Sequence, residues 1–226
     1  MKNTAIVLAG GLGKRLLPLT KTIPKPLLKV GKKTILEIII THLEKNNFKK
    51  IIIAARYKSE KFNLIMPYLN KRFKNIEIKL SIEKKPLGTC GPIKLVEEEL
   101  PEKFLLINGD ILTNFNLKSN FIQFKKSQSK FLAFSKKIVT PFRFGKIVSR
   151  NNRILKIIEK PEYENEILSG IYLFDKEILK FIPKNKYYGI DQLINKLIDK
   201  KVHITKKTLD GYWLDIGEIQ TYEKVK

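Results

Sequence analysis

Continuous apolar runs alternate with amphipathic segments through the first half of the chain. The runs at 5–8, 51–55 and 104–107 hold only apolar residues, many of them β-branched, which is typical of parallel strands buried on both faces. The segment 76–82 alternates apolar and polar residues, which predicts a strand nearer the edge of the sheet. Strands that alternate with helices predict right-handed crossovers and a three-layer, Rossmann-like α/β sandwich around a central, mostly parallel mixed sheet.

Capping and turn signals locate the expected helices. Thr34 is followed three residues later by Glu37, a capping-box pattern that predicts a helix start just before the apolar stripe of 35–43. A second helix is expected over 60–69, with an interruption near Pro67. We further expect helices after Thr89 as far as Glu99 and at 117–126, 176–181 and 190–200, strands at 131–135, 167–172 and 202–205, and two short strands around an Asn151-Asn152 turn.

Ligands of such sheets bind beyond the carboxyl ends of the strands. The loop after the first strand, the residues after Ala55 and those after Ile82 are therefore expected to lie on one rim of the sheet. Candidate binding residues should gather at that rim.

A glycine-rich turn follows the first strand directly, with Gly10, Gly11 and Gly13. Glycines let the backbone approach a ligand closely, and inward-facing amides form a concavity for anions. Arg15 adds a planar fork suited to phosphate oxygens, and Lys25 adds a point charge on a backbone stiffened by flanking prolines. A phosphate ligand is therefore predicted. The nucleotide-binding candidates of this stretch are Leu8, Ala9, Gly10, Gly11, Gly13 and Lys14.

Composition narrows the class of protein. A length of 226 residues with 43% hydrophobic content predicts one well-buried domain. No apolar run reaches the roughly 20 residues that span a bilayer, and no cleavable secretory signal precedes the first strand, so no membrane partner is expected. The single cysteine excludes an intrachain disulfide and fits the cytoplasm. The net charge of +23 arises from 39 lysines and six arginines spread along the chain, which argues against nucleic acid as a partner.

The opening motif is more specific than a glycine-rich turn alone. The pattern G-G-x-G-x-R-L, followed some ten residues later by P-K-P, resembles the signature of the sugar-1-phosphate nucleotidyltransferases. Lys14 stands where that family commonly has Thr or Ser. The resemblance implies the nucleotide-diphospho-sugar transferase type of fold, and a reaction that joins a nucleoside triphosphate to a sugar 1-phosphate and releases pyrophosphate. It also implies a single catalytic domain over 1–226, with a nucleotide-binding half at about 1–110 and a sugar-binding half at about 111–226.

The segment 83–89 resembles the family's E-x-x-P-L-G-T motif, which lies over the nucleobase and whose counterparts here are Glu83, Pro86, Gly88 and Thr89. A carboxylate only accepts hydrogen bonds. Guanine offers two adjacent donors, N1–H and N2–H, whereas uracil and thymine offer one donor between two carbonyls. A carboxylate at position 83 therefore predicts GTP as the nucleotide. The alternative interpretation is that Glu83 is exposed to solvent and only forms an ion pair with Lys84 or Lys85.

Two aspartates match the family's metal ligands. Asp110 follows a buried strand and a glycine, and Asp215 lies in a segment that resembles the W-x-D-x-G motif. The resemblance implies that both hold Mg²⁺ and that Arg15 and Lys25 complete the catalytic group. A hard cation that keeps several waters suits such carboxylates. The alternatives are an Asx turn or cap at Asp110 and a purely structural anchor at Trp213.

The sugar phosphate is expected to contact residues of the second half of the chain. The family resemblance implies roles for Gly145, in an aromatic-Gly step, and for Glu159 and Lys160, in an E-K-P motif. Leu168 stands where the family often has an asparagine that contacts the C2 substituent, so an N-acetyl-sugar is not supported.

The resemblance is strongest to the guanylyltransferase branch that includes glucosamine-1-phosphate guanylyltransferase of legionaminic acid synthesis. GTP and a hexose or hexosamine 1-phosphate are therefore the expected substrates, with GDP-glucosamine the favoured product. The alternatives are a mannose- or heptose-1-phosphate guanylyltransferase, a UTP- or dTTP-dependent glucose-1-phosphate enzyme, and a non-catalytic sensor of sugar nucleotides. In that branch the catalytic domain is sometimes fused to a regulatory module, so such a fusion, or a homo-oligomer, is among the expected assemblies.

Overall fold

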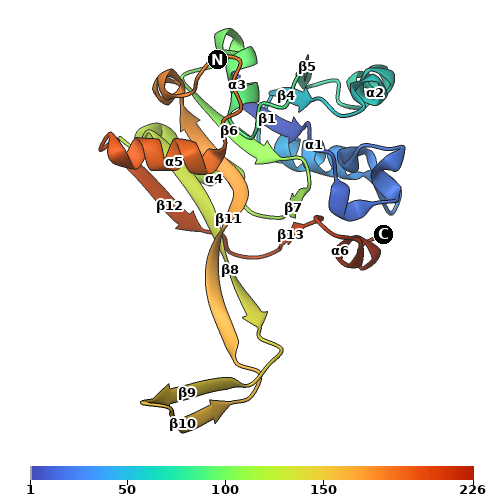
Figure 1. Ribbon diagram of the computed structural model, residues 1–226. Coiled ribbons are helices and arrows are strands. Elements are labelled where there is room, and N and C mark those ends of the chain that lie inside the picture. The colour runs from blue at the N-terminus through green and yellow to red at the C-terminus, as the bar shows by residue number, and fades with distance from the viewer. Residues whose placement is uncertain (1) are drawn as a thin grey trace.

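The computed structural model describes residues 2–226 and contains a seven-stranded mixed sheet in the order β12-β8-β11-β6-β1-β4-β5 (Figure 1). The strands β6, β1, β4 and β5 run parallel to one another, and β11 pairs antiparallel with both β6 and β8. The expected mostly parallel mixed sheet is confirmed, and β5 lies at its edge as predicted. The strands of the sheet are β1 (Thr4–Ala9), β4 (Lys50–Ala55), β5 (Glu77–Ile82), β6 (Lys103–Asn108), β8 (Phe131–Pro141), β11 (Glu162–Asp175) and β12 (Ile204–Thr208).

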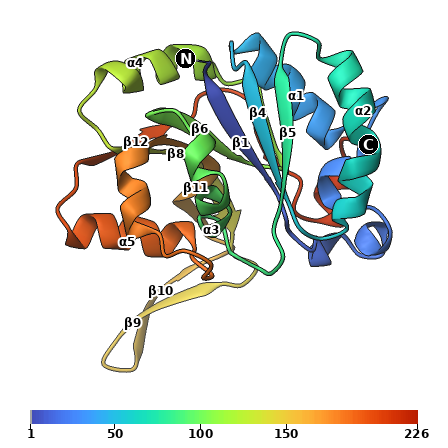
Figure 2. The same ribbon diagram turned by 90° about the horizontal axis from the view of Figure 1, so that it is seen from above.

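Helices cover both faces of this sheet, which confirms the three-layer sandwich (Figure 2). Successive residues of a strand point to opposite faces, so Ala5 and Val7 of β1 pack with one set of helices and Ile6 packs with the other. The first face buries α1, α2 and α4, and the second buries α3 and α5. The helices are α1 (Ile35–Lys45), α2 (Ser59–Arg72), α3 (Gly91–Leu95), α4 (Leu117–Lys126), α5 (Ile190–Asp199) and α6 (Ile219–Glu223), with 3₁₀ turns at Lys14–Leu16, Leu19–Lys21, Lys25–Leu27, Glu97–Glu99 and Lys176–Phe181. Among residues 2–226, no helix is both long and apolar enough to cross a bilayer.

The start of α1 is a complete capping box, as predicted. The Thr34 hydroxyl accepts a hydrogen bond from the Glu37 amide at 3.1 Å, and the Glu37 carboxylate accepts one from the Thr34 amide at 2.8 Å. Both satisfy amides at the first turn that have no partner inside the helix.

Replacing Thr34 with Ala is expected to lower the free energy of unfolding by about 1 kcal/mol, because the first turn loses its cap. Urea denaturation followed by far-ultraviolet circular dichroism measures the change. Thr22→Ala, at an exposed position, serves as the control. An equal loss in both variants would show that the cap contributes nothing specific.

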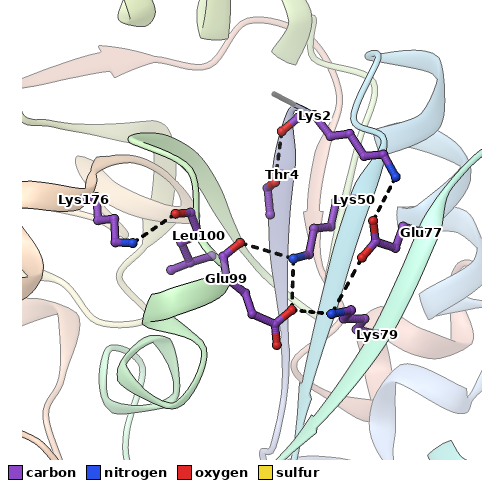
Figure 3. A network of polar contacts seen from close by, with 8 residues as sticks. All are labelled: Lys2, Thr4, Lys50, Glu77, Lys79, Glu99, Leu100 and Lys176. Atoms are coloured by element: carbon purple, nitrogen blue, oxygen red, sulfur yellow. Dashed lines mark hydrogen bonds and ion pairs between the residues drawn. The ribbon is translucent and has the colours of Figure 1, made fainter.

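Three predicted helices differ from those in the structure, and one of them, expected at 176–181, is the 3₁₀ turn Lys176–Phe181. The interruption near Pro67 is wrong, because α2 continues through it while Phe62 and Leu69 anchor the helix to the core on either side. The helix expected to reach Glu99 ends at Leu95 and gives way to a 3₁₀ turn. That turn brings the Glu99 carboxylate within 3.0 Å of Lys50 and 2.7 Å of Lys79 on the sheet (Figure 3).

A long ribbon extends from the body of the protein (Figure 1). The strands β8 and β11 continue well past the apolar segments predicted at 131–135 and 167–172, and end in a separate hairpin. Asn151 and Asn152, both at positive φ, form the predicted turn of that hairpin. We call residues 136–167 the arm. The remaining short strands are β2 (Lys29–Val30), β3 (Lys33–Thr34), β7 (Ile111–Thr113), β9 (Lys146–Arg150), β10 (Arg153–Ile158) and β13 (Trp213–Asp215).

Candidate active site

A cavity of about 340 Å³ opens at the carboxyl ends of β1, β4, β5 and β6, the rim that the topology predicts for a ligand. Most of the predicted nucleotide-binding residues and Asp110 line it. The predicted residues in its wall are Leu8, Gly10, Gly11, Glu83, Pro86, Gly88, Thr89 and Asp110. A larger cavity of about 650 Å³, between α1 and the segment after β7, contains none of the predicted residues.

Glu83 is a buried carboxylate in the wall of the smaller cavity. Its side-chain oxygen accepts a hydrogen bond from the Leu87 amide at 3.3 Å, so the expected alternative of an exposed pair with lysine does not describe it. A Cβ added to Gly10 would lie 2.6 Å from the other carboxylate oxygen, so a larger residue there would displace the Glu83 carboxylate. Burial raises the pKa of Glu83, while the Leu87 amide and the nearby Arg56 guanidinium act in the opposite direction.

Asp110 and Asp215, distant in sequence, are brought together by pairing between β7 and β13. Asp215 is the register partner of Ile111, and the Ile216 amide donates to the Asp110 carbonyl oxygen at 3.0 Å. Each aspartate has one buried carboxylate oxygen without a hydrogen-bond partner, and the other oxygen of Asp110 pairs with Lys25. Burial and the Asp110 carboxylate raise the pKa of Asp215, against the opposing effects of Lys25 and Arg15.

Arg15 and the glycine-rich turn lie beside this aspartate pair. A Cβ added to Gly217 would lie 3.0 Å from an Arg15 guanidinium nitrogen and 3.2 Å from an Asp215 oxygen, which places the guanidinium next to the carboxylate. Gly13 adopts a left-handed φ of 61°, and its carbonyl oxygen accepts a hydrogen bond from the Thr20 hydroxyl at 2.8 Å. Of the remaining predicted residues, Lys14 is exposed, whereas Ala9 is buried in the core and does not line the cavity.

The predicted sugar-phosphate residues fall into two groups. Leu168 begins a bulge in β11, where the Trp213 indole donates to the Ser169 carbonyl oxygen at 2.9 Å and Gly170 packs against the Asn108 side chain. That bulge therefore lies beside the cavity wall. Trp213 also packs against the core, as its anchor interpretation expects.

The other sugar-phosphate residues lie on the arm, away from the aspartate pair (Figure 1). Gly145 and Glu159 are neighbours there, because a Cβ added to Gly145 would lie 3.1 Å from a Glu159 carboxylate oxygen. Neither they nor Lys160 line the cavity that contains Asp110.

Sequence reasoning missed several residues of the cavity wall. Arg56 directly follows β4. The residues after Ala55 are expected at the rim, but nothing in the sequence singles out Arg56. Tyr187 reaches the cavity from a distant loop, because the Tyr188 amide donates to the Leu87 carbonyl oxygen at 2.9 Å. Leu87, Asn108 and Gly109 are sequence neighbours of predicted residues.

Comparison with known proteins places this geometry in a family. The family model for nucleotidyl transferases matches residues 4–226. Mannose-1-phosphate guanyltransferase beta-B of Xenopus laevis is 32% identical over 95% of this chain, which spans 61% of that protein. D-glycero-alpha-D-manno-heptose 1-phosphate guanylyltransferase of Campylobacter jejuni is 32% identical over 96% of both chains.

Solved structures agree with these sequence matches. The crystal structure of HddC from Yersinia pseudotuberculosis complexed with GMP-PN superposes with a TM-score of 0.73 and 26% identity, and covers 100% of this chain and 98% of that one. The fold, the cavity at the rim of the sheet and the family match over residues 4–226 agree with one another. This chain therefore belongs to the nucleotidyl transferase family, and these curated relatives lie in the guanylyltransferase branch of the sugar-1-phosphate enzymes.

Proposed function

We propose that this chain is a sugar-1-phosphate guanylyltransferase, which makes a GDP-sugar and pyrophosphate from GTP and a sugar 1-phosphate. The observation that carries the proposal is a buried carboxylate, Glu83, in the same cavity as Asp110. One end of the cavity thus suits a base with two adjacent donors, and the other suits phosphates. The curated relatives quoted above are named as guanylyltransferases, which supports the same base.

The aspartate pair fits a divalent cation. Two buried oxygens without partners, one on Asp110 and one on Asp215, are acceptors that a hard ion such as Mg²⁺ would satisfy. Among residues 2–226 no group of three or more His, Cys, Asp or Glu side chains is arranged to hold a metal, so water and phosphate oxygens would complete the coordination. When bound, the ion would neutralise charge on the phosphates and polarise the α-phosphate.

The chemical step is an in-line substitution at the α-phosphorus of GTP. A bond forms between that phosphorus and a phosphate oxygen of the sugar 1-phosphate, and its bond to the oxygen bridging to the β-phosphate breaks, so pyrophosphate leaves. Amides of the glycine-rich turn and the Arg15 guanidinium orient the triphosphate, and Lys25 stabilises negative charge near Asp110. Such positioning and charge stabilisation require no protein nucleophile.

The sugar phosphate is proposed to bind residues of the second half, 111–226, beside the bulge at Leu168. Gly145, Glu159 and Lys160, on the arm, are proposed as further contacts of the sugar or its phosphate. The relatives' names point to mannose 1-phosphate and D-glycero-alpha-D-manno-heptose 1-phosphate as first substrates to test, with glucosamine 1-phosphate as the third.

A pyrophosphate-release assay tests this function directly. Each of GTP, ATP, UTP and dTTP is combined with each of the three sugar phosphates and with glucose 1-phosphate, in the presence of Mg²⁺. Turnover that requires GTP is the expected result. Turnover with UTP or dTTP and none with GTP would overturn the proposal.

Replacing Glu83 with Gln is expected to reduce kcat/KM for GTP by about ten- to a hundredfold, because the glutamine NH₂ group is a donor and would face an N–H donor of guanine. The penalty for UTP is expected to be much smaller. The same assay measures both, and Glu98→Gln, at an exposed carboxylate, is the matched control. Equal losses for GTP and UTP would assign Glu83 a structural role instead.

A further inference from the structure

Arg56 lies next to Glu83 at the rim of the sheet. The register of β4 and β5 pairs Ala55 with Ile82, so the two residues that follow them are neighbours, and the Glu83 amide donates to the Ala55 carbonyl oxygen at 2.9 Å. A Cβ added to Gly10 would lie 3.4 Å from the Arg56 Cβ and 2.6 Å from a Glu83 oxygen, so both side chains flank the same glycine. Among the described residues that line this cavity, Arg56 carries the one positive charge.

The strand order fixes which part of a nucleotide Arg56 can reach. Along the rim, Asp110 follows β6, Gly10 follows β1, Arg56 follows β4 and Glu83 follows β5. Neighbouring strands lie about 4.8 Å apart, so the Arg56 backbone is about 5 Å from that of Glu83 and about 10 Å from the strand of Asp110. The Arg56 side chain therefore enters the cavity at the end that contains Glu83, where the base is proposed to bind.

A carboxylate alone reads only part of guanine. Glu83 can accept from N1–H and N2–H, but it leaves the acceptors O6 and N7 without a partner, and an unmet polar group in a closed site is costly. Arginine offers five donors in a planar fork and no acceptor, and bidentate contact with O6 and N7 is its commonest specific contact with guanine in DNA. Adenine presents an amino donor in place of O6, which would oppose the guanidinium.

We propose that Arg56 is a specificity-determining residue that donates hydrogen bonds to O6 and N7 of guanine, while Glu83 accepts from the neighbouring N–H groups. This inference rests on the proposed guanylyltransferase function. The guanidinium also lowers the pKa of Glu83, against the larger raising effect of burial. A purine with O6, N7 and a 2-amino group is the ligand that satisfies both side chains at once.

The test combines variants of Arg56 with analogues of GTP. Arg56→Ala is expected to lower kcat/KM for GTP by about ten- to a hundredfold. With 6-thio-GTP, which has a weak acceptor in place of O6, or with 7-deaza-GTP, which lacks N7, the further loss on mutation is expected to be much smaller, because the contact is already weakened. Arg56→Lys keeps the charge without the planar fork and is expected to recover little discrimination.

Two outcomes would overturn the role of Arg56. One is an unchanged kcat/KM for GTP in Arg56→Ala. The other is an equal fold-loss of kcat/KM for GTP, both analogues and UTP, which would mean that the side chain contacts the triphosphate or has a structural role. Lys61→Ala, an exposed cation on α2, controls for a change in overall charge, and thermal melting of every variant controls for folding. Failure of the parent function is recognised separately, because it appears as a wild-type protein that does not use GTP.

Discussion

Replacing Asp110 with Asn is expected to reduce turnover on the order of a thousandfold while GTP still binds in the absence of metal. Asp110 lines the cavity at the rim of the sheet, and one of its carboxylate oxygens is buried without a partner. An amide keeps the shape of the side chain but removes the negative charge that the proposed cation requires. The pyrophosphate-release assay measures turnover, and calorimetric titration of GTP in EDTA measures binding.

Two controls separate chemistry from folding in this variant. Asp199→Asn, at the exposed end of α5, removes the same charge from a site remote from the cavity and should leave turnover unchanged. Thermal melting is needed because Lys25 loses its ionic partner in Asp110→Asn. Full turnover in a folded Asp110→Asn protein would exclude a catalytic role for this carboxylate.

The central sheet was predictable because its strands are buried on both faces. Continuous apolar runs such as 51–55 leave few other interpretations, and the Thr34 capping box marks a helix start by local chemistry alone. The same logic places the cavity, because parallel strands present their carboxyl ends to one rim. Local signals combined with topology were therefore sufficient to predict most of the wall of this cavity.

Long-range contacts account for what the sequence did not reveal. Tyr187 enters the cavity because backbone hydrogen bonds tie its loop to Leu87, a pairing that no local pattern announces. The arm was underestimated for a related reason. Past Ser135 and before Ile167 the paired strands carry mostly exposed residues, so hydrogen bonding continues where hydrophobic periodicity stops. A two-stranded ribbon has no covering layer to hold it against the body, and the hairpin of β9 and β10 extends away from the body as a result (Figure 1).

Replacing Asp215 with Asn is expected to move activity and stability in opposite directions. Turnover should fall by about a hundred- to a thousandfold, because the second proposed cation ligand loses its charge. The free energy of unfolding of the metal-free protein should rise by about 1 kcal/mol at pH 7, because a half-buried carboxylate with one unpartnered oxygen no longer carries its charge near Asp110. Such an unfavourable arrangement of two carboxylates persists at a functional site because the rest of the fold holds both side chains in place.

The dependence on pH tests the physical cause of that gain. Burial and the Asp110 carboxylate raise the pKa of Asp215 in the folded state, so the wild-type protein bears the cost of the charged form above that pKa and escapes it as the pH falls through it. The stability gap between Asp215→Asn and wild type should therefore narrow on acidification, as measured by urea denaturation at a series of pH values in EDTA. Asp199→Asn should show no such gap. A variant that is less stable than wild type at pH 7, or a gap that widens toward low pH, would mean that burial and the Asp110 carboxylate do not disfavour the charged form of Asp215 in the folded protein.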